Sequence, residues 1–421
     1  MNSRTNNPTT TAIPSGIGDT AALSLAEPRS LDRSALLPWT HAATLAPSPD
    51  NNQPWRFEIT GQSIDVFLDR ARALPSDVHS LFDLTAIGAA VENCCIAARA
   101  SGYRPTITID HPHSQLSAPS ALTRIANICF EADANGDALS NLLTTRHTSR
   151  AAYSTQPVDD QHLRGLAEAV GSFPEVQLHW IRDRSAIRQC AWLIGRSDRL
   201  RFERQAFHSE LFRQLRFTPA EAQATRDGLD LRTLGLPPFG SLTLRAISNW
   251  NVLNAMNFLG ASRMLSMPSV MSVLCSGAIG LLTIPRADCE SLVGGGRAFQ
   301  RLWLALSGLA SSNPRSGNQK LQLHPLGSLP IFLAHWDQLH GRELTPSQQR
   351  LAQRIKRDFI RLVPTAADRV LQIAFRIGYG PASPCRSLRR DAHDVLAEPG
   401  LPGAHPALSP DAIARIDEHA A

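Results

Sequence analysis

Two short polar clusters carry side chains suited to holding a ligand. The first lies in the segment 46–57, APSPDNNQPWRF, where Pro, Ser, Asp and Asn precede an alternating aromatic pattern. Proline fixes φ, and Ser, Asp and Asn side chains bond nearby backbone groups, so this composition predicts a structured turn. A turn held at the entrance of a strand can present amide and hydroxyl groups to a ligand. A proline-rich surface turn without a ligand is the alternative.

The second cluster, Arg146-His147-Thr148-Ser149-Arg150, contains two guanidiniums, two hydroxyls and an imidazole within five residues. Guanidinium groups form bidentate charge-assisted hydrogen bonds, so the cluster suits a phosphate or a carboxylate. A solvated loop with salt bridges is the alternative. A third basic cluster, 386–390, follows a predicted strand late in the chain, and an exposed basic tail is its alternative interpretation.

Composition narrows the class of protein. A chain of 421 residues suggests two or three domain-sized units, and a hydrophobic content of 43% is ordinary for a globular protein. A net charge of +5 without an Arg-rich run interleaved with aromatics argues against a nucleic-acid partner. Seven scattered cysteines predict neither a disulfide framework nor a metal site and favour the cytoplasm. The most apolar run, 268–285, predicts a buried strand and turn, so we expect no membrane partner.

Periodicity divides the chain into alternating helices and strands. The predicted helices are 30–45, 83–102, 159–170, 182–196, 290–308 and 344–363, and the predicted strands are 55–59, 64–68, 103–110, 123–131, 176–181, 269–275, 329–335 and 370–378. The strands 55–59 and 64–68 should pair as a hairpin across Gly61, and small residues in 83–102 permit close helix packing. The run Gly294-Gly295-Gly296 fits neither GxGxxG nor a P-loop, and we predict that it lies within a helix. The stretch 204–257 is a candidate lid or insertion.

The two polar clusters together resemble motifs of the nitroreductase superfamily of flavin mononucleotide (FMN) enzymes. PSPDNNQPWRF is similar to its PSxxNxQPWxF loop, and RHTSRAAY to its RxS/TxR/K element. The resemblance implies that Ser48 and Asn51 contact the flavin and its ribityl-phosphate arm, with Pro47 and Pro49 shaping the loop. It further implies that Arg146 and Thr148 hold the phosphate, that His147 contributes through its backbone, and that Arg150 lies near the N1/O2 edge of the isoalloxazine.

The resemblance implies further FMN contacts later in the chain. A polar turn at 310–318 would lie against the flavin N5 side, through backbone amides near Ser312 and Asn313. A late strand followed by Arg389 and Arg390 resembles the family's C-terminal element, whose basic residue reaches the phosphate. No catalytic side chain is expected, because the hydride passes through flavin N5 and Arg150 supplies electrostatic support for the reduced form.

The order of the motifs departs from the ordinary family pattern, in which the arginine element precedes the PSxxN loop and the enzyme is a homodimer. Here the loop comes first, which resembles the Acg-type branch, a single chain that imitates the dimer by fusion of two halves. The implied fold is α+β with mostly antiparallel sheets. The implied units are a disordered segment 1–30, a half 31–143, a half 144–398 with a lid insertion 204–257, and a tail 399–421. The chain would be a monomer by fusion, or a further dimer.

The resemblance leaves several functions open. The first is an FMN-dependent oxidoreductase acting on a small organic substrate, either by NAD(P)H-driven reduction or as a dehydrogenase of a metabolite. The second is a non-catalytic protein that binds and sequesters FMN beneath a lid. A third is an enzyme of a biosynthetic pathway whose substrate a partner delivers.

Overall fold

The computed structural model describes residues 31–77, 80–110, 122–133, 135–236, 238–309, 319–335 and 344–397. Within these ranges the helices and strands gather around two separate four-stranded sheets. Every strand pairing in both sheets is antiparallel. The expectation of an α+β fold with mostly antiparallel sheets is therefore confirmed for the described residues.

The first sheet has the strand order β1-β2-β4-β3 and follows the predicted hairpin. Its strands are β1 (Trp55–Thr60), β2 (Ser63–Asp69), β3 (Tyr103–Ile109) and β4 (Leu122–Ala132), and its helices are α1 (Arg33–Thr44) and α2 (Leu81–Ala100). Gly61 adopts φ +59 between β1 and β2, a left-handed conformation that glycine reaches without a Cβ clash. Trp55 and Phe57 are buried, which fixes the register of β1.

The second sheet has the order β5-β8-β10-β9. Its strands are β5 (Gln177–Ile181), β8 (Ala278–Ile284), β9 (Lys320–Pro325) and β10 (Val370–Gly380), and its helices include α3 (Asp160–Val170), α4 (Arg184–Phe202), α10 (Cys289–Leu309) and α12 (Pro346–Leu362). After β10 the chain returns to the first sheet. The amide of Ala397 donates to the carbonyl of Phe57 at 2.7 Å, next to α13 (Ala392–Val395).

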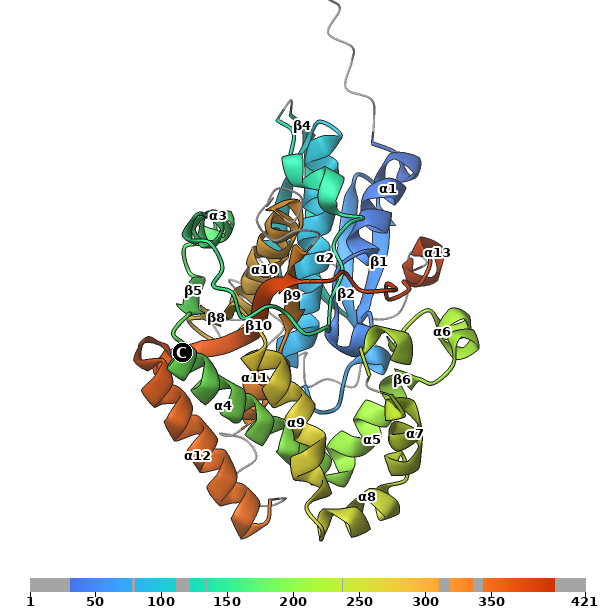
Figure 1. Cartoon of the computed structure of the whole chain (residues 1–421). Coiled ribbons are helices and arrows are strands. Elements are labelled where there is room, and N and C mark those ends of the chain that lie inside the picture. Colours follow the sequence, from blue (N-terminus) through green and yellow to red (C-terminus); the bar gives the residue numbers. More distant parts are fainter. Residues whose placement is uncertain are drawn as a thin grey trace, which may run out of the picture. The chain divides into compact units, whose positions relative to one another are not determined.

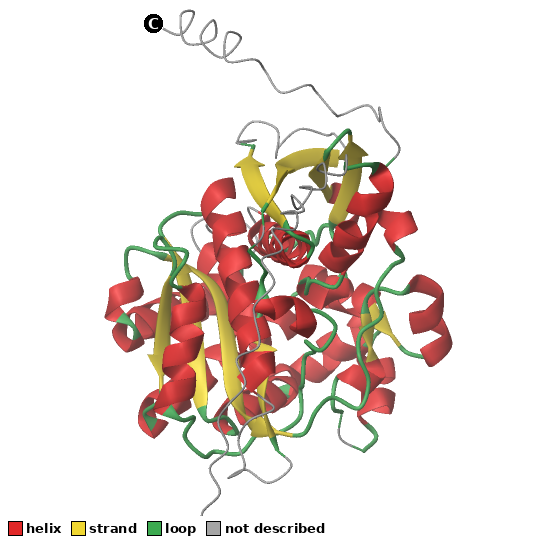
Figure 2. Cartoon of the chain, turned by 90° about the horizontal axis from the view of Figure 1, so that it is seen from above, coloured by secondary structure: helices red, strands yellow, loops and turns green. Residues whose placement is uncertain are grey.

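Helices α2 and α10 pack against each other between the two sheets (Figures 1 and 2). A Cβ added to Gly88 of α2 would overlap the backbone of Val293, and one added to Gly296 of α10 would overlap the backbone of Thr85. Both helices are thus in backbone contact, as the small residues predicted. The triple-glycine run lies inside α10, as expected. Among the described residues α2 alone is long and apolar enough to span a membrane, and 89% of that window is buried inside the protein.

The stretch 204–257 forms short helices rather than a bare loop. Its elements are α5 (Gln205–Gln214), β6 (Leu215–Arg216), α6 (Pro219–Thr225), β7 (Leu229–Asp230), the 3₁₀ turn η5 (Leu231–Thr233), α7 (Gly240–Ile247) and α8 (Trp250–Asn257). The strands β6 and β7 pair in parallel as a separate small sheet. Small apolar clusters that include Leu215, Leu229 and Leu253 hold these elements together.

Two predicted strands are wrong. Residues 269–275 belong mostly to α9 (Ala261–Leu274), and residues 329–335 belong to α11 (Ser328–His335). A short apolar run that is buried on one side has no period that separates strand from helix. Helix α9 continues through the internal Pro268. The strand predicted within 268–285 starts later, at Ala278, where β8 is buried on both faces.

Candidate functional site

The loop that precedes β1 holds three non-glycine residues at positive φ. Asp50, Asn51 and Gln53 have φ values of +46, +58 and +51. Each such residue costs about 1 kcal/mol or more and persists only where the surroundings hold it in place. Pro49–Asn51 form the short 3₁₀ turn η1, and the Ser48 hydroxyl accepts the Gln53 amide at 3.0 Å. The sequence pattern of this loop therefore folds into a strained, well-ordered turn.

Asn51 binds two segments that are distant in the sequence. Its Nδ2 donates to the carbonyls of Gly228 at 3.2 Å and Leu388 at 3.1 Å. Its Oδ1 accepts from Nη1 of Arg389 at 2.7 Å. Arg389 also donates from Nε to the carbonyl of Ala46 at 3.2 Å. One asparagine thus joins the 47–53 loop, the 204–257 stretch and the C-terminal arginine segment.

Arg146 is a buried cation without a carboxylate partner among the described residues. Its Nη2 donates to the carbonyl of Leu45 at 3.2 Å, and its guanidinium carbon lies 4.6 Å from the centroid of the Trp303 ring. Its Nε is buried and has no hydrogen-bond partner within the described part of the chain. Burial, with Arg389 and Arg386 nearby, lowers the pKa of Arg146 to about 9. Burial likewise lowers the pKa of Arg389 to about 10.

Buried charges are normally paired, because an isolated ion loses its hydration on burial. The described contacts of Arg146 and Arg389 go to carbonyls, to an amide oxygen and to an aromatic ring. Two neighbouring cations that lack a counter-charge and include an unpartnered N–H create a preference for an anion. A phosphate supplies both the negative charge and several acceptor oxygens.

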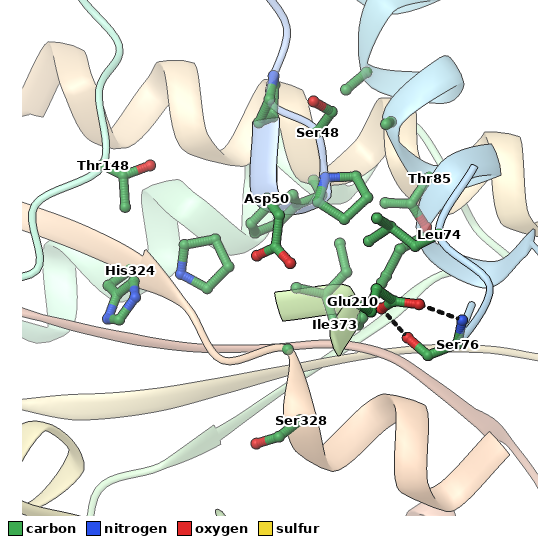
Figure 3. A pocket seen from close by; sticks show the side chains of 18 of the residues that line it. Ser48, Asp50, Leu74, Ser76, Thr85, Thr148, Glu210, His324, Ser328 and Ile373 are labelled. Atoms are coloured by element: carbon green, nitrogen blue, oxygen red, sulfur yellow. Dashed lines mark hydrogen bonds between the residues drawn. The ribbon is translucent and has the colours of Figure 1, made fainter. Parts of the chain in front are cut away.

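A cavity of about 210 Å³ lies between the two polar clusters. It is lined by the 47–50 turn, by Thr148 and Arg150, and by residues of α2, α10, β9, α4 and α5. In Figure 3, Ser48 and Asp50 lie between Thr148 and His324 on one side and Leu74 and Thr85 on the other. Aromatic rings that line it come from both central helices and from α5, namely Phe82, Phe207, Phe299 and Trp303.

The structure brings most of the predicted site residues into one region. Pro47, Ser48, Pro49, Thr148 and Arg150 line the cavity itself. Asn51, Arg146 and Arg389 are not among its lining residues, but Arg146 packs on the ring of Trp303, which lines it, and Arg389 bonds to Asn51.

Other predicted residues lie elsewhere. The Arg390 side chain donates to the carbonyl of Asp394 at 2.6 Å. Its backbone amide donates to Gln53 Oε1 at 2.9 Å, so the Arg390 backbone contacts the 47–53 loop. His147 places Nδ1 3.0 Å from the carbonyl of Thr145 and does not line the cavity. Ser312 and Asn313 lie outside the described residues.

Arg150 connects the cavity to the 204–257 stretch. Its Nη1 donates to the carbonyl of Thr233 at 3.3 Å. Burial lowers its pKa from the usual value, and the nearby Asp50 carboxylate opposes that shift. Asp50 itself pairs with Arg201 of α4 at 3.2 Å. Arg150 therefore brings a guanidinium to the cavity lining, close to the Asp50 carboxylate.

His324 is a cavity residue that no sequence motif indicated. Its Nδ1 accepts from Nε of the buried Arg376 at 3.1 Å. Burial, together with Arg376 and Arg150, lowers the pKa of His324 well below its usual value. The ring is therefore neutral, and with Nδ1 accepting, Nε2 carries the proton and is a hydrogen-bond donor.

A group of three carboxyls adjoins the cavity at the start of α2. Glu210 of α5 lines the cavity and accepts from the amide of Ser76 at 2.7 Å and from the Ser76 hydroxyl (Figure 3). Asp77 accepts from the Phe82 and Asp83 amides, capping α2. Burial and the Asp83 charge raise the pKa of Asp77 well above its usual value. Burial raises the pKa of Asp83 to about 7, and Glu210 adds to the effect.

Stability should therefore fall as pH rises from about 4 to about 7. A carboxyl with a raised folded-state pKa binds its proton more tightly in the folded protein than in the unfolded chain, whose value is near 3.8. The stabilisation is lost as pH rises through the folded pKa of Asp83, about 7, and changes little above it. In Asp83→Asn, which retains an acceptor for Asn52, thermal melting should depend less on pH across this window. An unchanged slope in this variant would contradict the assignment to Asp83.

The comparisons with known proteins give distant likenesses. No family model matches the chain. A curated relative, an uncharacterized protein of Mycobacterium tuberculosis (strain CDC 1551 / Oshkosh), is 24% identical over 356 residues, which is 84% of this chain and 47% of the relative. The chain thus spans about half the length of that relative.

Among solved structures, the FMN and NADPH-dependent nitroreductase NfnB from Sphigopyxis sp. strain HMH is 17% identical, with a TM-score of 0.33. A mutant of the same enzyme is 16% identical, also with a TM-score of 0.33. Each match covers 63% of this chain and the whole of the solved chain.

Proposed function

We propose that this chain is an FMN-dependent oxidoreductase that acts on a small organic substrate. The observation that carries the proposal is the buried Arg146, which has an unpartnered Nε and lies close to Arg389 with no carboxylate among its described contacts. This donor set fits the phosphate of FMN. The strained 47–53 loop and the aromatic cavity beside the arginines fit the rest of a flavin nucleotide. NAD(P)H is our candidate reductant, as the resemblance of the two sequence motifs implies.

In this proposal each element of the site has a separate task. Arg146 and Arg389 bind the phosphate by charge-assisted hydrogen bonds. The Ser48 and Thr148 hydroxyls orient the ligand from opposite sides of the cavity. Arg150 supplies positive potential to the ligand, and the Nε2–H of His324 supplies a hydrogen-bond donor. The cavity's aromatic side chains exclude water. When bound, FMN supplies hydride transfer through its N5 position, which requires no catalytic acid–base pair from the protein.

The proposal includes a fused arrangement. One motif comes from the segment before the first sheet, and the other comes from the segment before the second. The cavity lies between α2 and α10, which belong to different halves in the proposed division. This supports one complete flavin site per chain, as in the Acg-type branch, with the 204–257 stretch as its lid.

An anaerobic absorbance spectrum tests the proposed activity. Protein loaded with FMN should show a flavin absorbance band at about 450 nm that bleaches when NADPH is added. Loss of the band supports nicotinamide-driven reduction. A band that persists with NADPH but bleaches with a metabolite donor supports the dehydrogenase direction. Protein that takes up no FMN contradicts the proposal.

The contacts of the 204–257 stretch favour a second candidate, a protein that sequesters FMN. Gly228 and Arg226 accept from the side chains of Asn51 and Gln53 at 3.2 and 2.9 Å. Glu210 holds the Ser76 turn. These bonds join the proposed lid to the loop that would hold the cofactor.

The variant Glu210→Ala separates the two candidates, because it removes the bonds between α5 and Ser76. A sequestering protein should release FMN and react with NADPH at least about tenfold faster in this variant, since two hydrogen bonds to a charged group are lost. If the protein is a reductase, the wild type should already react rapidly with NADPH, and the variant should change that rate little. Stopped-flow absorbance under anaerobic conditions measures both rates.

A further inference from the structure

The turn between α8 and α9 presents two large apolar side chains to solvent. Phe258 is 88% exposed and Leu259 is 90% exposed. Gly260 follows at φ +85 and starts α9, so the two side chains lie at the end of a helical hairpin. Figure 1 places α8 and the turn at the edge of the molecule, away from both four-stranded sheets. Two adjacent, almost fully exposed apolar residues are unusual on a surface that faces only water.

Methionine side chains continue this surface along both helices. Apart from Met1, the chain has four methionines, and all lie on α8 and α9. These are Met256, Met264, Met267 and Met271, with exposures from 37% to 75%. The opposite faces of the same helices bury Leu253, Val270 and Val273. Both helices therefore carry apolar residues on the core side and on the outer side, a pattern expected when a second apolar phase covers the outer side.

The same region has no negative charge in its sequence. From Leu231 to Ala287 the chain contains four arginines and no Asp, Glu or Lys. Two of them, Arg232 and Arg286, pair with Asp230 and Asp288 just outside this range, and Arg245 and Arg263 have no carboxylate partner among the described residues. Arg263, on α9, is exposed, and no carboxylate among the described residues pairs with it. The carboxylates that contact α9 come from the end of α4 and are bound within the protein: Glu203 pairs with Arg199 at 2.5 Å, and Asp198 bonds to Ser269. The outer surface is thus apolar with isolated positive charges.

We propose that the α8–α9 hairpin docks on an anionic lipid surface, with Phe258 and Leu259 entering the boundary between headgroups and acyl chains. Helices suit this environment because their backbone polar groups are satisfied internally. Arginines without neighbouring acids are attracted to anionic headgroups. A contact between two copies of this surface would instead bring Arg263 toward its equivalent with no carboxylate between them. The charge pattern therefore favours lipid over a second copy, and this departs from the expectation of no membrane partner.

Sedimentation of the full-length protein with vesicles tests the proposal. One vesicle contains phosphatidylcholine and phosphatidylglycerol, and the other contains phosphatidylcholine alone. Binding should be stronger to the anionic vesicle. The double variant Phe258→Ser/Leu259→Ser should lower the partition coefficient by about tenfold or more, and Arg263→Gln by about fivefold on the anionic vesicle. Because both side chains of the double variant are solvent-exposed, its melting temperature should match the wild type.

The control is Ile360→Ser on α12, which removes an exposed apolar side chain at another place. Its partition coefficient should stay within about twofold of the wild type. The proposal is overturned if the wild type does not sediment with the anionic vesicle, or if the control and the double variant lose binding equally. It is also overturned if the protein ignores vesicles but forms a dimer in lipid-free solution that the double variant dissociates, since the surface would then be an interface between copies. None of these outcomes depends on the proposed flavin.

Discussion

Replacing Arg146 by methionine should weaken FMN binding by about 100-fold, because charge-assisted hydrogen bonds to the phosphate are lost. Without FMN the same variant should be more stable than the wild type, by about 1–4 kcal/mol, since a buried unpaired cation is replaced by an apolar group. Methionine also keeps a flexible side chain packed against the Trp303 ring. Isothermal titration with FMN and thermal melting of the FMN-free protein measure the two effects.

The matched control is Arg386→Met in the same basic neighbourhood. Arg386 is exposed, donates to the carbonyl of Thr144 and only adds to the positive potential at Arg146. This variant should change the FMN dissociation constant by less than about threefold, the size expected of a solvent-screened charge. If both variants weaken FMN equally, or if Arg146→Met destabilises the FMN-free protein, the anion site is not at Arg146.

The second large effect concerns the crossing of α2 and α10. Gly88→Ala should destabilise the protein by about 3 kcal/mol or more, because its methyl group would overlap the backbone of Val293 and the helices would have to separate. Thr85, Ala86 and Ala89 of α2 line the cavity, so FMN uptake should fall as well. Denaturant unfolding and FMN titration measure the two losses.

Gly294→Ala is the control for this prediction. It lies one helical turn or less from the crossing, but its added methyl would meet only the end of the flexible Glu175 side chain, at 2.9 Å. Alanine is the better helix former, by about 1 kcal/mol, so this variant should be neutral or slightly more stable. Equal destabilisation by both substitutions would contradict this account, because helix propensity favours alanine at both positions and only Gly88 meets a backbone.

The elements around the first sheet were predictable from sequence because their signals are local. Alternation in 55–68 with Gly61 at the turn predicted a hairpin, and the paired strands β1 and β2 confirm it. The small residues of 83–102 predicted close helix packing, and the Gly88 contact confirms that as well. The errors at 269–275 and 329–335 arise because a short apolar run lacks a period that distinguishes a strand from a helix.

The surroundings of the site could not be predicted in the same way. His324 and Glu210 reach the cavity from β9 and α5, and neither belongs to a local motif. The raised pKa of Asp83 depends on burial and on Glu210, more than a hundred residues away. The sequence did indicate the ligand site through two local motifs, PSPDNN and RHTSR. The structure places members of both around one cavity, while Arg146 and Arg389 are not among its lining residues.

The central claim is that Arg146 and Arg389 form a phosphate site for FMN. Its most direct test is an equilibrium titration of the FMN-free protein with FMN and, separately, with riboflavin, which lacks the phosphate. Quenching of flavin fluorescence measures the binding. We predict that FMN binds about 100-fold or more tightly than riboflavin, and that this ratio collapses in Arg146→Met. Equal affinities for the two flavins, or no binding of either, would contradict the claim.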